Sequence, residues 1–241
     1  MCFVITLTGS FFQTLVSLLS VRGDIERNLI SALELLSLRR TPPTCCNNVW
    51  TVLNSEEPIL SSSYDYLFKV VVLGEGAVGK TAIVTRFSHG FFRTDYKTTI
   101  GSQFAVKNID VLGADQVNQV VKLQIWDVAG QSRFQILRPM YYRGSNGGLL
   151  VYDVSRRRTF MLLQEWLDEL HKAIQKEIPL VLVANKTDLP DRVVEPSEGR
   201  EFADAHNMPY VESSAKTGEG VVDIFEQLGT TLVRKRQTGN R

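Results

Sequence analysis

GEGAVGKT, residues 74–81, is the stretch that decides the fold of this 241-residue chain. It satisfies the pattern G-x-x-x-x-G-K-[ST], a loop whose backbone N–H groups surround the phosphates of a nucleoside triphosphate. Apolar residues at 68–73 predict a buried strand before the loop, and apolar residues with helical spacing follow it. Glycine lets the backbone approach phosphate oxygens closely, and the N-terminus of a helix attracts anions. The stretch therefore predicts a triphosphate site; the alternative is a glycine-rich turn that binds nothing.

A second segment, WDVAGQ at residues 126–131, follows an apolar run at 120–125 that predicts another strand. Asp127 at the end of this strand can hold the shell of a Mg²⁺ ion. Gly130 can approach the γ-phosphate, and Gln131 can orient a water molecule for attack on it. The segment therefore adds hydrolysis to triphosphate binding.

Two later segments indicate which base is bound. NKTD at residues 185–188 closes an apolar strand predicted at 179–184, and SAK at 214–216 follows a last predicted strand at 210–212. The carboxylate of Asp188 can accept hydrogen bonds from the N1–H and the exocyclic amine of guanine, whereas adenine would leave that charge unpaired. NKTD alone is a weak signal that also fits an ordinary strand-to-helix turn. The four segments in this order are specific for a guanine nucleotide.

Residues 66–237 resemble the Ras superfamily of small GTPases, and most closely its Rab branch. The Rab-like segments are KLQIWD at 122–127, YYRG at 141–144 and VYD at 151–153. Gly76 and Ala77 make the phosphate loop look more like that of the Rho branch. The Rho-type insertion between Asp188 and the last strand is missing, so the resemblance to Rab is the stronger one.

The resemblance implies an α/β fold, the P-loop NTPase G domain, with a mostly parallel open sheet and helices on both faces. It divides the chain into an N-terminal extension at 1–63 that the family lacks, a small GTPase domain at 64–237 and a tail at 238–241. The connection at 112–119 looks several residues longer than the usual Rab turn. The elements predicted after the loop are helices at 79–88, 159–176, 196–205 and 221–236, and a hairpin of strands at 103–111 and 120–125.

The resemblance also assigns roles to the loops. Residues 95–101 match the first switch, in which Thr99 rather than Thr98 reaches Mg²⁺ and the γ-phosphate, and the second switch runs over 127–143. Such loops are ordered by the γ-phosphate and released on hydrolysis. Phe92 matches an aromatic residue that stands edge-on against guanine; its alternative is an ordinary apolar anchor beneath a loop.

The predicted site residues fall into three groups. The catalytic residues are Gln131 and Lys80, and the residues that hold the Mg²⁺ cofactor are Thr81, Thr99 and Asp127. The nucleotide-binding residues are Gly74, Glu75, Gly76, Ala77, Val78, Gly79, Lys80, Thr81, Ala82, Phe92, Thr99, Gly130, Asn185, Lys186, Asp188, Ser214, Ala215 and Lys216.

The function that follows is a GTP-hydrolysing molecular switch of the Rab/Ras type, slow without an activating partner, that regulates membrane trafficking or signalling. Its partners besides GTP and GDP would be effectors, exchange factors and GTPase-activating proteins that contact the switches. Gly76 leaves room beside the γ-phosphate for an arginine from an activating protein. Val128 and Ser132 replace the usual Thr and Glu of the second switch, which puts partner recognition and the intrinsic rate in question, but not nucleotide binding.

Two alternatives stay open. A GTP-binding scaffold with negligible hydrolysis would act by protein contact alone, and the presence of Gln131 and Thr99 argues against it. A P-loop ATPase or small-molecule kinase would share the phosphate loop, but Asn185 and Asp188 would then have no purpose.

Composition and charge narrow the partners and the compartment. The 27 Lys and Arg residues nearly balance the 26 Asp and Glu residues, so the chain lacks the strongly basic face that nucleic-acid binding needs. The three cysteines, two of them adjacent at Cys45 and Cys46, offer neither a disulfide framework nor metal-ligand spacing. The charge balance therefore argues against general nucleic-acid binding. The cysteine pattern fits the reducing cytosol, where GTP is also found, so we expect a cytoplasmic protein.

Residues 1–63 do not fit the GTPase pattern and leave three alternatives. Residues 3–21 contain no charge and are just long enough to span a bilayer, although several polar residues dilute them. Residues 24–40 predict an amphipathic helix, and residues 44–63 look like a linker. The segment is a membrane anchor that keeps the GTPase on the cytosolic face, a regulatory extension that packs on the GTPase, or an inert leader.

The C-terminus departs from the Rab pattern. Rab proteins carry C-terminal cysteines for prenylation, and this chain ends RKRQTGNR at 234–241 without one. We therefore expect no C-terminal prenylation. The basic residues either touch anionic lipid weakly or form a solvated helix end that the helix dipole favours.

Overall fold

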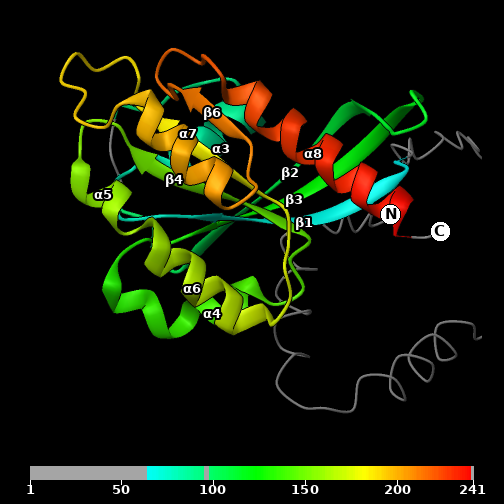
Figure 1. Cartoon of the computed structure of the whole chain (residues 1–241), viewed down its shortest axis with the longest axis horizontal. Coiled ribbons are helices and arrows are strands. Elements are labelled where there is room, and N and C mark those ends of the chain that lie inside the picture. Colours follow the sequence, from blue (N-terminus) through cyan, green and yellow to red (C-terminus); the bar gives the residue numbers. More distant parts are fainter. Residues whose placement is uncertain (1–63, 95–97, 240–241) are drawn as a thin grey trace, which may run out of the picture. The chain divides into compact units, whose positions relative to one another are not determined.

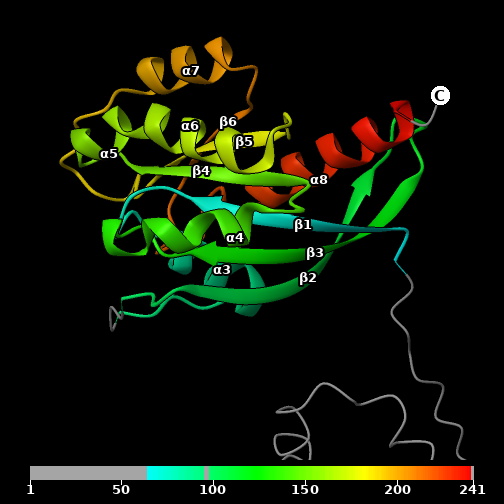
Figure 2. The same cartoon turned by 90° about the horizontal axis from the view of Figure 1, so that it is seen from below.

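A six-stranded sheet forms the centre of the computed structural model, which describes residues 64–94 and 98–239. Its strand order is β2-β3-β1-β4-β5-β6 (Figure 2). The strands are β1 (Tyr66–Leu73), β2 (Ser102–Leu112), β3 (Asn118–Val128), β4 (Gly147–Asp153), β5 (Leu180–Asn185) and β6 (Tyr210–Ser213). The helices are α3 (Lys80–His89), the 3-10 helix η1 (Ser132–Leu137), α4 (Arg138–Tyr142), α5 (Arg157–Met161), α6 (Leu163–Ile174), α7 (Pro196–Ala205) and α8 (Val221–Thr238).

The direction of the strands places the loops that follow them at one edge of the sheet. β2 and β3 pair antiparallel, whereas β3, β1, β4, β5 and β6 pair in parallel with one another. A parallel connection must cross over one face of the sheet, and these crossovers carry the helices. The loops after five parallel strands therefore meet where an open α/β sheet binds its ligands.

Two hydrophobic cores lie on opposite faces of the sheet. Alternate residues of β1 point into them: Val70 and Val72 join one core, and Val71 and Leu73 join the other. The first core is covered by α3 and α8, and the second by α4, α6 and α7 (Figures 1 and 2). Because both faces are covered, β4 and β5 are buried along their whole length, as expected for inner parallel strands.

The predicted fold class, a mostly parallel open sheet with helices on both faces, is confirmed. The helix predicted at 196–205 coincides with α7. The prediction of a single helix at 159–176 is wrong, because the chain forms α5 and α6 with a break at Leu162. The break lets Phe160 of α5 contact the ring of Phe202, with centroids 5.9 Å apart, while α6 turns a separate apolar stripe towards the sheet.

The β2–β3 hairpin is longer than the strands predicted at 103–111 and 120–125. Pairing continues to Leu112 and Asn118, so the connection consists of residues 113–117 rather than 112–119. A backbone hydrogen bond from Gly113 N–H to the carbonyl of Val117, at 2.9 Å, closes the turn. The short helices η1 and α4 in the second switch were also absent from the prediction.

Part of what the sequence predicts falls outside the described residues. This holds for the span at 3–21, the amphipathic helix at 24–40, the linker at 44–63 and residues 95–97 of the first switch. In the ranges that the structure covers, no helix is both long and apolar enough to cross a bilayer. The domain boundaries after residues 63 and 237 stay predictions.

Candidate nucleotide-binding site

A cavity of about 540 Å³ opens at the edge of the sheet where β1 and β5 end. The predicted residues that line it are Gly76, Ala77, Gly79, Lys80, Thr81, Ala82, Phe92, Thr99, Gly130, Gln131, Asn185, Lys186, Asp188, Ala215 and Lys216. The other predicted residues contact these from behind and are Gly74, Glu75, Val78, Asp127 and Ser214. The lining residues that the sequence analysis missed are Thr85, Arg93, Thr94, Thr98, Gln103 and Leu189.

The phosphate loop is closed around a buried lysine. Gly74 has a φ of +133°, and a Cβ there would stand 2.1 Å from the carbonyl oxygen of Val151, so only glycine fits. The ammonium of Lys80 donates hydrogen bonds to the carbonyls of Gly74 and Glu75 at 2.6 and 2.8 Å. Burial lowers the pKa of Lys80 to about 8, although the carboxylate of Asp127 opposes the shift. A phosphate in the loop would supply the negative charge that favours the ammonium form.

Asn185 connects the phosphate loop to the turns after β5 and β6. Its side-chain N–H donates to the carbonyl of Val78 at 2.8 Å, and its Oδ1 accepts from the N–H of Ala215 at 3.2 Å. A Cβ at Gly79 would lie 2.2 Å from the Asn185 amide nitrogen, so the glycine makes room for this contact. Asn185 is buried, lines the cavity and also links the phosphate loop to the turn after β6.

Three predicted metal ligands from three elements meet beside the loop. The hydroxyl oxygens of Thr81 and Thr99 are 2.8 Å apart, and Thr81 also donates a short hydrogen bond to Oδ2 of Asp127. Asp127 is fully buried, and among the described residues its Oδ1 has no hydrogen-bond partner. Burial raises the pKa of Asp127, while Lys80 and the bond from Thr81 oppose the rise. An orphaned carboxylate oxygen beside two hydroxyls fits a hard, oxygen-loving cation such as Mg²⁺.

The base side of the cavity is held by polar contacts around Asp188. Its Oδ1 accepts a hydrogen bond from the hydroxyl of Ser214 at 2.6 Å, and the ammonium of Lys216 lies 3.6 Å from its Oδ2. Phe92 lines the cavity and also packs against the core beneath it. The two interpretations of Phe92, a base contact and an apolar anchor, are therefore compatible with each other.

Comparison with known proteins identifies the group to which this chain belongs. A model of the Ras family matches residues 69–234. The chain is 40% identical over 195 residues to the GTP-binding protein YPT1 of Saccharomyces cerevisiae. The aligned region covers 75% of this chain and 92% of that protein. It is also 43% identical over 165 residues to the Ras-related protein RABA5a of Arabidopsis thaliana. Here the aligned region covers 68% of this chain and 72% of the relative. The chain belongs to the Ras family.

This small GTPase stands close to the Rab branch, as its sequence predicts. A second Arabidopsis thaliana relative, the Ras-related protein RABA1b, is 41% identical over 176 residues. The aligned region covers 73% of this chain and 79% of the relative. Ras-family proteins are P-loop GTPases that bind GTP, generally with Mg²⁺, and act through regulators and effectors. The phosphate loop, the Asp127 cluster and the Asp188 pocket are the elements that such an activity requires.

In this small GTPase a buried arginine holds the start of the second switch from behind. The Arg138 guanidinium donates to the carbonyls of Ala129, Gly130 and Gln131 at 3.2, 2.8 and 2.9 Å. It also pairs with Glu169 of α6 at 3.0 Å. The sequence analysis missed this residue. The signal that could have found it is a single charge in an otherwise apolar stretch, ILRPMYY at 136–142.

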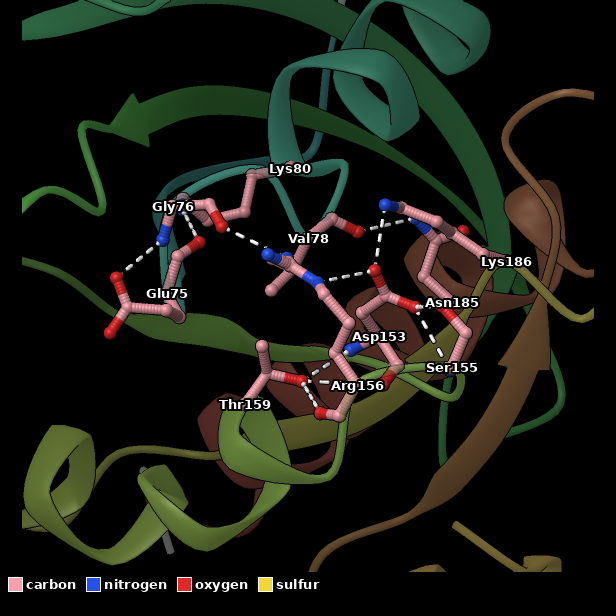
Figure 3. Close-up of polar contacts among 10 residues, drawn as sticks. All are labelled: Glu75, Gly76, Val78, Lys80, Asp153, Ser155, Arg156, Thr159, Asn185 and Lys186. Atoms are coloured by element: carbon pink, nitrogen blue, oxygen red, sulfur yellow. Dashed lines mark hydrogen bonds and ion pairs between the residues drawn. The ribbon is translucent and has the colours of Figure 1, made fainter. Parts of the chain in front are cut away.

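Two further residues that the sequence analysis missed lie between the phosphate loop and the base-side turn. Asp153 ends β4 and pairs with Lys186 at 2.7 Å and with Arg156 at 2.9 Å (Figure 3). Arg156 also donates to the carbonyl of Gly76 at 3.0 Å. In the sequence Asp153 stands out only as part of the Rab-like segment VYD, because Lys186 is remote along the chain.

Proposed function

We propose that this chain is a GTP-binding and GTP-hydrolysing molecular switch of the Rab/Ras type that acts in membrane trafficking or signalling. The observation that carries the proposal is the meeting of Thr81, Thr99 and Asp127 within hydrogen-bonding distance. These residues come from the phosphate loop, the first switch and the end of β3. Bound GTP with its Mg²⁺ can therefore hold the first switch against the phosphate loop. Loss of the γ-phosphate would release that switch.

The residues divide the work of hydrolysis among them. Gln131 lines the cavity beside Gly76, where it can orient water for in-line attack on the γ-phosphate. Lys80 and the amides of the loop stabilise the charge that spreads over the phosphate oxygens as the bond to the GDP oxygen breaks. Mg²⁺ held by Thr81, Thr99 and Asp127 would supply further positive charge to the same oxygens.

Guanine selectivity comes from the base side. Among the residues that the structure describes, the one cation near Oδ2 of Asp188 is the ammonium of Lys216 at 3.6 Å, so a purine that offers two donors can bind to this carboxylate. Adenine, which offers one acceptor in place of a donor, would leave a desolvated charge without a partner. This supports GTP and GDP as ligands over ATP.

Partner proteins would bind apolar side chains on the switches and on the strands β2 and β3 that join them. The core of this surface is a row of aromatic rings in which Phe104 and Tyr141 flank Trp126, with centroid distances of 5.1 and 6.0 Å. In the switches themselves, Ile100 and Ile136 leave 78% and 89% of their area exposed. Exposed apolar side chains of this kind mark a site for other proteins, here effectors, exchange factors and activating proteins.

The proposal also places residues 64–237 as the GTPase domain and residues 1–63 as a separate extension. A cytoplasmic location follows from the need for GTP. Attachment to a membrane through residues 1–63 remains part of the proposal, and those residues lie outside the described part of the chain.

The proposal is tested with the purified full-length chain. We expect GTP and GDP to bind in the presence of Mg²⁺, and a large excess of ATP to leave the bound GTP in place. Single-turnover hydrolysis of GTP should proceed slowly and should stop when Mg²⁺ is chelated. Displacement by ATP would favour an ATPase or kinase. Tight GTP binding with no phosphate release over many hours would instead favour the scaffold alternative.

A further inference from the structure

Asp153 is a buried carboxylate at the end of β4 for which the proposed hydrolysis has no role. Its Oδ2 accepts hydrogen bonds from Lys186 Nζ at 2.7 Å and from Arg156 Nε at 2.9 Å. Its Oδ1 accepts from the N–H and the hydroxyl of Ser155 at 3.0 and 2.7 Å. Burial alone would raise the pKa of Asp153, but the hydrogen bonds from Lys186 and Ser155 outweigh burial and hold the pKa below its ordinary value. The carboxylate is therefore ionised at neutral pH and binds two cations at once.

The two cations belong to different parts of the cavity. Lys186 lies in the base-side turn, two residues before Asp188, and it adopts a left-handed backbone with a φ of 71°. Arg156 reaches the other way, and its Nη2 donates to the carbonyl of Gly76 in the phosphate loop at 3.0 Å. Figure 3 shows the resulting series of contacts, which runs from Gly76 through Arg156 and Asp153 to Lys186.

The backbone around Arg156 is fixed before any ligand binds. Its N–H donates to the carbonyl of Asp153 at 3.0 Å, and its own carbonyl accepts from the hydroxyl of Thr159 at 2.8 Å. The same hydroxyl accepts a hydrogen bond from the N–H of Asp153 at 3.0 Å. Because the turn is held by these bonds, little freedom remains to be lost when the guanidinium binds the phosphate loop.

We propose that Asp153 and Arg156 are positioning residues that tie the phosphate loop to the base-side turn and thereby slow the release of guanine nucleotide. The inference rests on the proposed function, because it concerns the same cavity. Nucleotide leaves only when the loop around the phosphates or the turn around the base opens. A tie between the two makes each opening more costly, and it acts alongside the neutral link from Asn185 to Val78 at 2.8 Å.

Arg156 suits this role better than a purely structural one. Its side chain is 42% exposed and contributes to neither hydrophobic core, while the backbone bonds of its turn do not need the guanidinium. Its removal should therefore leave the fold intact and change the motion of the loop. The planar fork of arginine lets Nε and Nη2 bind two acceptors at once, which the single ammonium of lysine does not reproduce.

The experiment measures the rate at which a fluorescent GDP analogue leaves the full-length protein in Mg²⁺ when unlabelled GDP is added in excess. We expect Arg156→Ala to release the analogue about fivefold faster than the parent, a modest factor because the contact is charge-assisted but partly exposed. Arg156→Lys should lie between the two. The matched control is Arg157→Ala, which removes the neighbouring arginine and its 2.7 Å bond to Glu198 of α7, away from the phosphate loop. Its release rate should equal that of the parent.

A double-mutant cycle tests whether the two residues act together. Asp153→Asn removes the charge that holds Arg156, so adding Arg156→Ala to it should increase the release rate by clearly less than fivefold. Thermal unfolding of each GDP-loaded variant shows whether it is folded. If Asp153→Asn proves unfolded, the comparison of Arg156→Ala with Arg157→Ala still decides the matter.

The inference is overturned if folded Arg156→Ala releases the analogue at the rate of the parent or of Arg157→Ala. It is also overturned if the effects of the Asp153 and Arg156 substitutions simply multiply. A parent protein that takes up no guanine nucleotide would instead remove the proposed function itself. The two failures are thus distinguished by the parent protein alone.

Discussion

On the base side of the cavity, Asn185 and Ser214 are almost completely buried and each makes several hydrogen bonds, whereas on the switch side Ile100 and Ile136 leave most of their area in solvent. The buried polar contacts are made without any ligand. The exposed apolar residues gain little from folding, and they lie on the segments that we propose contact a γ-phosphate. The difference indicates that one side selects the nucleotide and the other reports which nucleotide is bound.

Asp188→Asn tests the base side and should have the largest effect. The amide would donate where the carboxylate accepts, so affinity for GTP should fall by about a thousandfold and xanthine nucleotides should be preferred. Equilibrium binding of GTP and XTP measures this change. Asp191→Asn, an exposed carboxylate three residues further on, is the control and should bind GTP normally. Unchanged GTP affinity in Asp188→Asn would remove Asp188 from the pocket.

Arg138→Met asks whether the switch side is anchored from behind. The substitution leaves three carbonyls of the second switch without their donor and Glu169 without its cation, so the free energy of unfolding should fall by about 2 kcal/mol. Urea unfolding in GDP measures the loss. Arg133→Met, at an exposed position of η1, should change stability by less than about 0.5 kcal/mol. Equal stability of the two variants would show that the Arg138 contacts carry no net free energy.

Gln131→Leu separates chemistry from affinity on the switch side. The side chain orients water but holds no phosphate in the proposed mechanism, so single-turnover hydrolysis should slow by about tenfold or more while GTP affinity stays the same. Gln135→Leu removes an exposed glutamine of η1 and should hydrolyse GTP like the parent. Hydrolysis at the parental rate in Gln131→Leu would mean that another group orients the water.

Ile136→Ser should have the smallest effect on the protein itself. The side chain is 89% exposed, so stability should change by less than about 0.5 kcal/mol and nucleotide binding should not change. Binding of any protein that recognises the GTP-loaded form should weaken, because the apolar surface on the switches is lost. A clear loss of stability or of GTP affinity would show that Ile136 is part of the fold rather than of a recognition surface.

The fold and the central site residues could be predicted because their chemistry is local. The phosphate loop needs glycines and a lysine at fixed spacing, and the ends of the parallel strands bring Asp127 and Asp188 to the same edge of the sheet. Even the choice of Thr99 over Thr98 agrees with the 2.8 Å contact between Thr99 and Thr81.

What the sequence analysis missed depends on partners that are distant along the chain. Arg156 contacts the carbonyl of Gly76 across 80 positions, and Arg138 pairs with Glu169 across 31. A backbone carbonyl carries no sequence signal, so no pattern of residue types announces the contact of Arg156. For Arg138, the single charge in an apolar stretch marks the residue but does not reveal its partner Glu169. The break at Leu162 was also missed; next to it Phe160 packs on Phe202, a partner 42 positions away that helical periodicity does not reveal.

Hydrogen exchange measured on the protein loaded with GDP and then with a non-hydrolysable GTP analogue tests most directly whether one side selects and the other reports. The GTP analogue should increase protection of backbone amides at 98–101 and 130–143, because in the proposed switch Thr99 and Gly130 contact the γ-phosphate. Protection at 185–188 and 213–217 should be the same in both states, because the base-side contacts are already formed. Equal protection of the switches in the two states, or a change confined to the base side, would contradict the account.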